Sequence, residues 1–192
     1  LVGSEMCIRD SIRTNYQKDK VKFLASFYPI YIMALNIVDG VEGIEVDCMA
    51  EVQVGCLHDF KLSTDNMRDI EKSDGFIING AGMEGFIEDI ANRVDGLHII
   101  DSSIGINLLA DGHHHDEDED EHDHEHEDEH NHDHGEYNAH LWVSVANYIK
   151  QVENITEGIV KIDPAHEKEY RRNSKEYICL LYTSPSPRDR QK

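Results

Sequence analysis

The chain has 192 residues, enough for one domain or one large lobe, and a formal net charge of −21. Residues 111–136 contain 14 Asp and Glu and no Lys or Arg, so they supply two thirds of that charge. The remaining sequence has no basic patch, which argues against nucleic acid as a partner, and no apolar run near the ~20 residues of a membrane span.

The two ends of the chain differ in character from the rest. Residues 1–11 read LVGSEMCIRDS, and residues 179–192 begin with CLLYTSPSPR. One DNA string and its reverse complement can encode both segments, as a translated sequencing adapter would. We therefore expect these tails to be artefactual and residues 12–178 to be native, an internal fragment. Within that part, Cys48 and Cys56 could form a disulfide, remain thiols or bind metal, and the last is the least favoured.

The first half of the native part alternates apolar runs with amphipathic segments. Pro and Gly separate these segments, and Ser63 and Thr64 offer helix N-caps. In chain order we expect a strand at Lys22–Tyr28, a helix at Ile30–Val38, a strand at Ile44–Glu51, a helix at Asp65–Lys72 and a strand at Phe76–Ile78.

The second half continues this alternation after the glycine-rich turn Asn79–Gly82. We expect a helix at Met83–Val94, a strand at Leu97–Ile100, a helix from Val145 to about Val160 and a charged helix at Ala165–Ile178. Strands that alternate with helices predict βαβ crossovers and a mainly parallel sheet, so the expected fold class is α/β.

A histidine-rich run from Gly112 to Gly135 interrupts the pattern. It cannot form a core, and it interleaves carboxylates with imidazoles, which are ligands that zinc and other transition metals prefer. A solvated acidic loop is the alternative, but such loops rarely carry so many histidines. We interpret the run, residues 111–136, as a disordered surface insertion that binds metal through His113, His114, His115, His122, His124, His126, His130, His132 and His134.

Two further histidines occupy loops that precede predicted helices. His58 follows the second strand and His140 follows the insertion. Loops at the carboxyl ends of parallel strands are where α/β sheets bind ligands, although a lone loop histidine is commonly a surface residue. Asp59 and Glu84 could orient a ligand histidine from a second shell. His166, on the charged helix, is expected to be exposed.

Two segments carry a resemblance to a known family. Gly55–Phe86 has a Gly, a His-Asp-aromatic sequence, a Ser/Thr-initiated helix, a strand, Asn-Gly and Gly-x-Glu. His140–Ile178 begins His-x-Trp-x-Ser and continues with Asp-Pro and a charged helix. Both resemble the high-affinity zinc-binding proteins of bacterial ABC transporters. The resemblance covers residues 20–178, and it departs from the family at Val145, where Pro is common.

The resemblance implies the amino-terminal lobe of a bilobed metal-binding protein. His58 and His140 would be metal ligands, a His and an acidic residue would come from the other lobe, and residues 164–178 would begin the long linking helix. The implied protein is an extracytoplasmic monomer, periplasmic or lipid-anchored, that delivers zinc to a membrane permease with its ATPase. Manganese is the less favoured metal.

Two other functional classes remain as alternatives. A metallohydrolase could use His58 and His140, but the chain has no His-Glu-x-x-His spacing and no evident general base, so we expect no enzyme. A metal-storage or adhesion protein could use the histidine-rich run alone. Loss or retention of tight one-to-one zinc binding in His58→Ala and His140→Ala would separate these classes.

Overall fold

The computed structural model describes residues 20–50, 57, 60–94, 96–109 and 137–183. Its centre is a parallel four-stranded sheet in the order β2-β1-β3-β4, which confirms the predicted α/β class. Each strand is short and begins within two residues of its predicted start. The strands are β1 (Val21–Ala25), β2 (Ile44–Cys48), β3 (Gly75–Ile78) and β4 (His98–Asp101).

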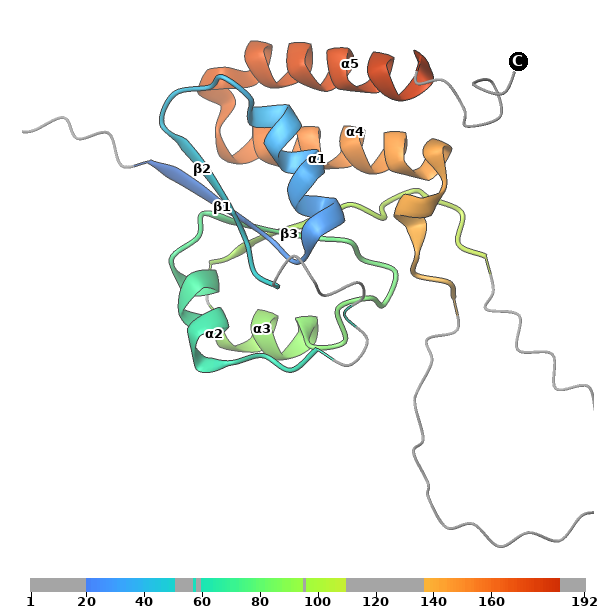
Figure 1. The fold of residues 1–192 in the computed structure, drawn as a ribbon. Helices are drawn as coiled ribbons and strands as arrows, with labels where there is room; N and C mark the ends of the chain where they lie inside the picture. The colour runs from blue at the N-terminus through green and yellow to red at the C-terminus, as the bar shows by residue number, and fades with distance from the viewer. Residues whose placement is uncertain (1–19, 51–56, 58–59, 95, 110–136, 184–192) are drawn as a thin grey trace, which may run out of the picture.

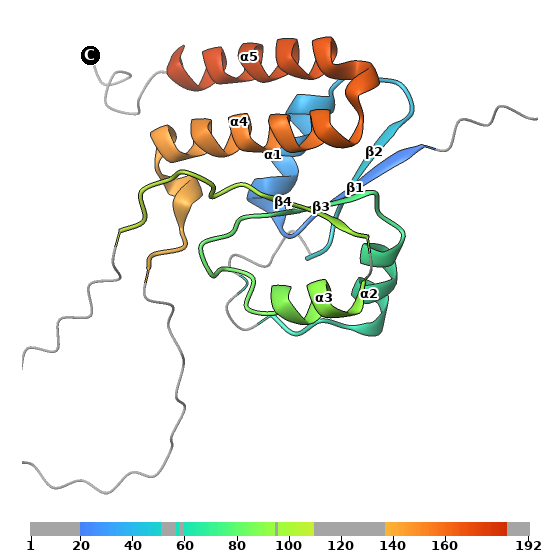
Figure 2. The same ribbon diagram turned by 180° about the vertical axis from the view of Figure 1, so that it is seen from behind.

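Helices cover both faces of the sheet, as Figures 1 and 2 show from opposite sides. One face carries α2 (Thr64–Glu71) and α3 (Ile87–Arg93). The other carries α1 (Tyr28–Val38) and α4 (Val145–Ile162), with α5 (Glu167–Thr183) packed outside them. Two 3-10 turns, η1 (Leu141–Val143) and η2 (Pro164–His166), precede α4 and α5. Among the described helices, none is long and apolar enough to cross a bilayer.

The core forms because the central strands are covered on both faces. All four residues of β3 are buried, as expected of an inner parallel strand. Close packing also explains Gly158 on α4, where an added Cβ would lie 2.4 Å from Cγ2 of Ile100 on β4. The largest fully buried side chains are Tyr170, Phe23, Phe27, Phe76, Ile30, Met33 and Ile37.

The predicted helix at Met83–Val94 was wrong at its start, because α3 begins only at Ile87. Ala81 and Gly82 have φ values of 54° and 81°, so the chain turns through the left-handed region first. Met83 is fully buried without being helical. The apolar spacing of the residues before Ile87 therefore reflects burial in a tight turn, although it resembles helical periodicity.

The corner between α4 and α5 is more polar and more buried than predicted. His166 was expected to be exposed, yet it is half-buried, and its Nδ1 lies 2.6 Å from Oδ2 of Asp163. The Tyr170 hydroxyl donates to the same oxygen at 2.6 Å. Burial alone would raise the pKa of Asp163, but these two hydrogen bonds lower it on balance. The helix that follows continues to Thr183.

Several predictions fall outside the described residues. They concern residues 1–11, the insertion at residues 111–136 and Cys56. Cys48 ends β2, where its thiol donates to the Ala50 carbonyl at 3.1 Å and burial raises its pKa. The adapter origin of the tails and the state of the cysteine pair stay predictions.

Candidate metal site

The candidate site lies at the carboxyl edge of the sheet, where polar residues follow three strands directly. Ser26 follows β1, Asn79 follows β3 and Ser102 follows β4, and all three are fully buried. Parallel strands bring these positions to one edge because their carboxyl ends point the same way. Buried polar groups require hydrogen-bond partners, so this edge is built around a side-chain network.

Asn79 is the centre of that network. Its Nδ2 donates to the carbonyls of Gly80 and Ala139, each at 2.9 Å. Its Oδ1 accepts from Nε2 of Gln151 on α4 at 3.0 Å. The same Nε2 lies 2.9 Å from Oγ of Ser102, which donates to the Asn79 carbonyl at 3.0 Å. Asn79 therefore links the sheet, helix α4 and the segment that carries His140.

Glu84 fixes the turn after β3. Its Oε1 accepts from the Ser26 hydroxyl at 2.7 Å and from the Asn79 N–H at 2.8 Å, while Oε2 accepts from the Gly80 N–H at 3.0 Å. Burial raises the pKa of Glu84, and the three donors offset part of that rise. The sequence suggested that Glu84 could orient a ligand histidine. In the structure its carboxylate binds the backbone of Asn79, whose side chain in turn binds the Ala139 carbonyl next to His140.

His140 is exposed and precedes η1. Its Nδ1 lies 3.1 Å from Oδ1 of Asn138, and its backbone N–H donates to the same oxygen at 2.9 Å. With its proton on Nδ1 directed at Asn138, the neutral ring carries its lone pair on Nε2. The ring also lies 5.2 Å from Trp142, whose indole packs edge-on against Phe27 at 4.9 Å. The imidazole is thus presented from a rigid support.

His58 and Asp59 lie outside the described residues, but their neighbours do not. Leu57 is 1% exposed, and its carbonyl accepts from the Phe60 N–H at 3.1 Å. The Phe60 ring packs against Phe86 at 5.9 Å, in the segment after the Asn79 turn. Phe60, on one side of His58, therefore packs against the same loop that binds the His140 segment. The two-histidine site stays a prediction.

The described residues on either side of the histidine-rich run meet beside His140. The Asn138 N–H donates to the Leu109 carbonyl at 2.9 Å, which joins the two flanks. All nine of its histidines lie outside the described residues. Among the residues that are described, no group of three or more His, Cys, Asp or Glu is arranged to hold a metal ion.

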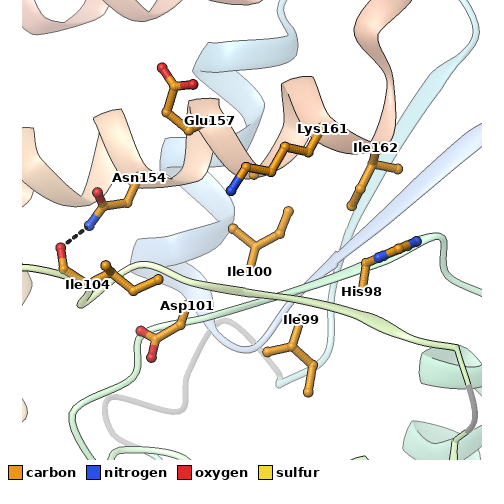
Figure 3. A pocket seen from close by; sticks show the side chains of 10 residues that line it. His98, Ile99, Ile100, Asp101, Ile104, Asn154, Glu157, Lys161 and Ile162 are labelled. Atoms are coloured by element: carbon orange, nitrogen blue, oxygen red, sulfur yellow. Dashed lines mark hydrogen bonds between the residues drawn. The ribbon is translucent and has the colours of Figure 1, made fainter.

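A separate hollow of about 240 Å³ lies between β4 and α4 (Figure 3). His98 and Asp101 border it on β4, and Glu157 and Lys161 border it on α4. Glu157 forms an ion pair with Arg171, and isoleucine side chains make up much of the rest of the lining. Its side chains do not form a metal-ligand set, so the candidate site remains at the carboxyl edge.

The sequence analysis missed the roles of Asn79 and Gln151. Asn79 was considered only as part of a glycine-rich turn, and Gln151 only as a position in an amphipathic helix. One signal was present, because Gln151 is a polar residue beside Val152 on the apolar face of α4, where it is fully buried. A polar side chain on such a face needs a specific partner.

A parallel sheet covered by helices on both faces, with polar side chains at its carboxyl edge, is the architecture in which α/β proteins bind ligands. Residues 24–182 match the family described as zinc-uptake complex component A, periplasmic (ZnuA). The chain therefore belongs to this family.

Individual relatives agree with that assignment. The chain is 32% identical over 165 residues to the high-affinity zinc uptake system protein ZnuA of Bacillus subtilis, covering 85% of this chain and 49% of that protein. It is 30% identical over 167 residues to the zinc-binding protein AdcA of Streptococcus pyogenes, covering 84% and 32%. The crystal structure of the metal-dependent lipoprotein YcdH of Bacillus subtilis superposes with a TM-score of 0.67 at 28% identity, covering 85% of this chain and 52% of that one. The chain thus spans about half the length of the Bacillus relative.

Proposed function

We propose that this chain is the amino-terminal lobe of the extracytoplasmic zinc-binding component of an ABC importer. The observation that carries the proposal is His140, held on a rigid support at the carboxyl edge of a lobe of this family. The names of the two relatives, a zinc uptake protein and a zinc-binding protein, support zinc as the cargo.

In the proposed site, zinc binds between two lobes. His58 and His140 supply two imidazoles from this lobe, and a His and an acidic residue from the other lobe complete a tetrahedral site. Half a site binds weakly, so closure of the second lobe completes capture. Imidazole binds metal only when it is neutral, so the affinity for zinc falls as the pH is lowered.

The partner in this proposal is a membrane permease with its ATPase. The protein acts as a monomer outside the cytoplasm, either in the periplasm or on a lipid anchor, and it catalyses no reaction. The family description, a periplasmic component of a zinc-uptake complex, supports the kind of partner and the compartment. Manganese as cargo, and metal storage or adhesion through the histidine-rich run alone, are the competing functions.

Growth under zinc limitation tests the transport function. In cells that lack their own zinc-binding component, the two-lobed protein should restore growth in chelator-treated medium, and the His140→Ala variant should not. Added zinc should restore growth of the His140→Ala strain, whereas added manganese should not. The His98→Ala variant is the matched control, because His98 is an exposed histidine on β4 outside the proposed site. Normal growth with His140→Ala would contradict the proposal.

Deletion of residues 113–134 separates the insertion from the main site. Because Leu109 and Asn138 are already hydrogen-bonded, the remaining short loop can close without moving His140. We expect the affinity of the two-lobed protein's main site to stay nearly unchanged while the number of bound zinc ions falls, as measured by isothermal titration calorimetry. The shorter loop should also raise the free energy of unfolding by roughly 1 kcal/mol. A large loss of main-site affinity would instead make the insertion part of the site.

A further inference from the structure

We propose that Asn79 and Gln151 are positioning residues that fix the peptide unit from which the His140 imidazole projects. The inference rests on the proposed role of His140 as a zinc ligand. It adds two residues that contact no metal and determine how well that ligand is preorganised.

The first step concerns the peptide bond between Ala139 and His140. Its carbonyl accepts from Asn79 Nδ2 at 2.9 Å and from the Leu141 N–H at 2.8 Å. Its N–H donates to Oδ1 of Asn138 at 2.9 Å. Hydrogen bonds on both edges of a planar peptide unit fix its orientation, and with it the Cα of His140. Among these hydrogen bonds, the one from Asn79 connects the peptide unit to the end of strand β3.

The second step concerns the orientation of the Asn79 amide. Both of its Nδ2 hydrogens are used, on the Gly80 and Ala139 carbonyls, and its Oδ1 accepts from Gln151. A flipped amide would face Nδ2 toward the Gln151 donor and Oδ1 toward two carbonyl oxygens. Gln151 therefore permits only the orientation that binds the Ala139 carbonyl.

The third step concerns Gln151 itself. Its side chain is fully buried, and its Oε1 has no hydrogen-bond partner within the part of the chain that the structure describes. An unpartnered buried acceptor costs stability, which an apolar residue at this place on α4 would avoid. The role of the Gln151 amide lies in its nitrogen, because Nε2 donates to both Asn79 Oδ1 and Ser102 Oγ. Gln151 therefore serves to orient the Asn79 amide, at some cost to the stability of the fold.

The test uses Asn79→Asp, which keeps the shape of the side chain and removes both donors. Asn173→Asp is the matched control. The buried Asn173 also donates from Nδ2 to two backbone carbonyls, those of Ile37 at 3.0 Å and Asp39 at 2.8 Å. Those bonds lie at the carboxyl end of α1, which is the opposite edge of the sheet. Both variants therefore lose two hydrogen bonds from an amide to backbone carbonyls, and only Asn79→Asp loses them near His140.

Two measurements distinguish positioning from stability. In the metal-free chain, NMR spectra should show the His140 ring and amide signals shifted and broadened in Asn79→Asp and unchanged in Asn173→Asp, with His140→Ala used for assignment. In the two-lobed protein, zinc affinity should fall about 10- to 100-fold in Asn79→Asp, the usual effect of removing a group that orients a ligand, and less than 3-fold in Asn173→Asp. Both variants should lower the melting temperature.

A second variant protects the test if Asn79→Asp does not fold. Gln151→Met removes the donor without adding charge, and it should produce the same NMR shifts with a smaller loss of affinity. Equal affinities for the two Asn→Asp variants, with unchanged His140 signals, would overturn the inference. If His140→Ala binds zinc normally while Asn79→Asp still shifts the His140 signals, the ligand assignment fails and the positioning role stands.

Discussion

Replacing His140 with alanine should weaken zinc binding by the two-lobed protein by more than about 100-fold. Loss of groups that merely orient a zinc ligand costs up to about 100-fold, and a direct ligand should cost more. A four-coordinate site that loses one imidazole must accept water in its place. Competition titration against a chromophoric chelator measures the affinity, and it is best performed with residues 113–134 deleted, so that the histidines of the insertion do not contribute.

The control for this experiment is a histidine outside the proposed site. His98→Ala removes an exposed imidazole from β4 and should leave the affinity unchanged. His58→Ala should match His140→Ala, because both residues are proposed ligands. Tight one-to-one binding that survives in His140→Ala would assign the site to other residues, and retained binding only when the insertion is present would favour a storage function.

Replacing Gly80 with alanine should lower the free energy of unfolding by about 2–4 kcal/mol. Gly80 has φ +78°, and a Cβ there would lie 2.1 Å from Oδ1 of Asp101 and 2.5 Å from Oγ of Ser103. Asp101 cannot move away cheaply, because its Oδ1 accepts from the N–H and the hydroxyl of Ser103 at 2.8 and 2.7 Å. Urea unfolding of the chain measures the change.

Two neighbouring glycines separate the two causes. Gly82 has φ +81° with nothing within 4 Å of an added Cβ, so Gly82→Ala should cost only the backbone strain, about 1 kcal/mol. Gly85 has neither a positive φ nor a close neighbour, and Gly85→Ala should change stability by less than about 0.5 kcal/mol. If Gly80→Ala proved no worse than Gly82→Ala, the close packing of this turn on Asp101 would be wrong.

The order of strands and helices could be predicted because each element carries its own signal. The apolar run of β3, the Pro29 start of α1 and the Ser63 cap of α2 are all local in sequence. The prediction failed at α3, where Met83 and Phe86 follow a helical spacing but are buried by a turn. Apolar spacing reports which residues are buried, and it identifies the element only when the backbone is regular.

The candidate site was predicted in part. His140 was proposed from its place before a helix, the structure shows its ring beside Trp142 and Asn138, and its role as a ligand stays a prediction. His58 was identified in the same way and stays a prediction. Glu84 was considered a possible partner for a ligand histidine, and in the structure it accepts hydrogen bonds from Ser26 and from the turn that begins with Asn79.

By itself, the sequence determined the α/β alternation and the presence of a histidine-rich run, because these follow from composition and short-range periodicity. Only the tertiary structure decided what supports His140. Asn79 and Gln151 are 72 positions apart, and Asn79 and Ala139 are 60 apart. Such contacts arise when parallel strands bring their carboxyl ends to one edge, and no local pattern encodes which polar side chains meet there.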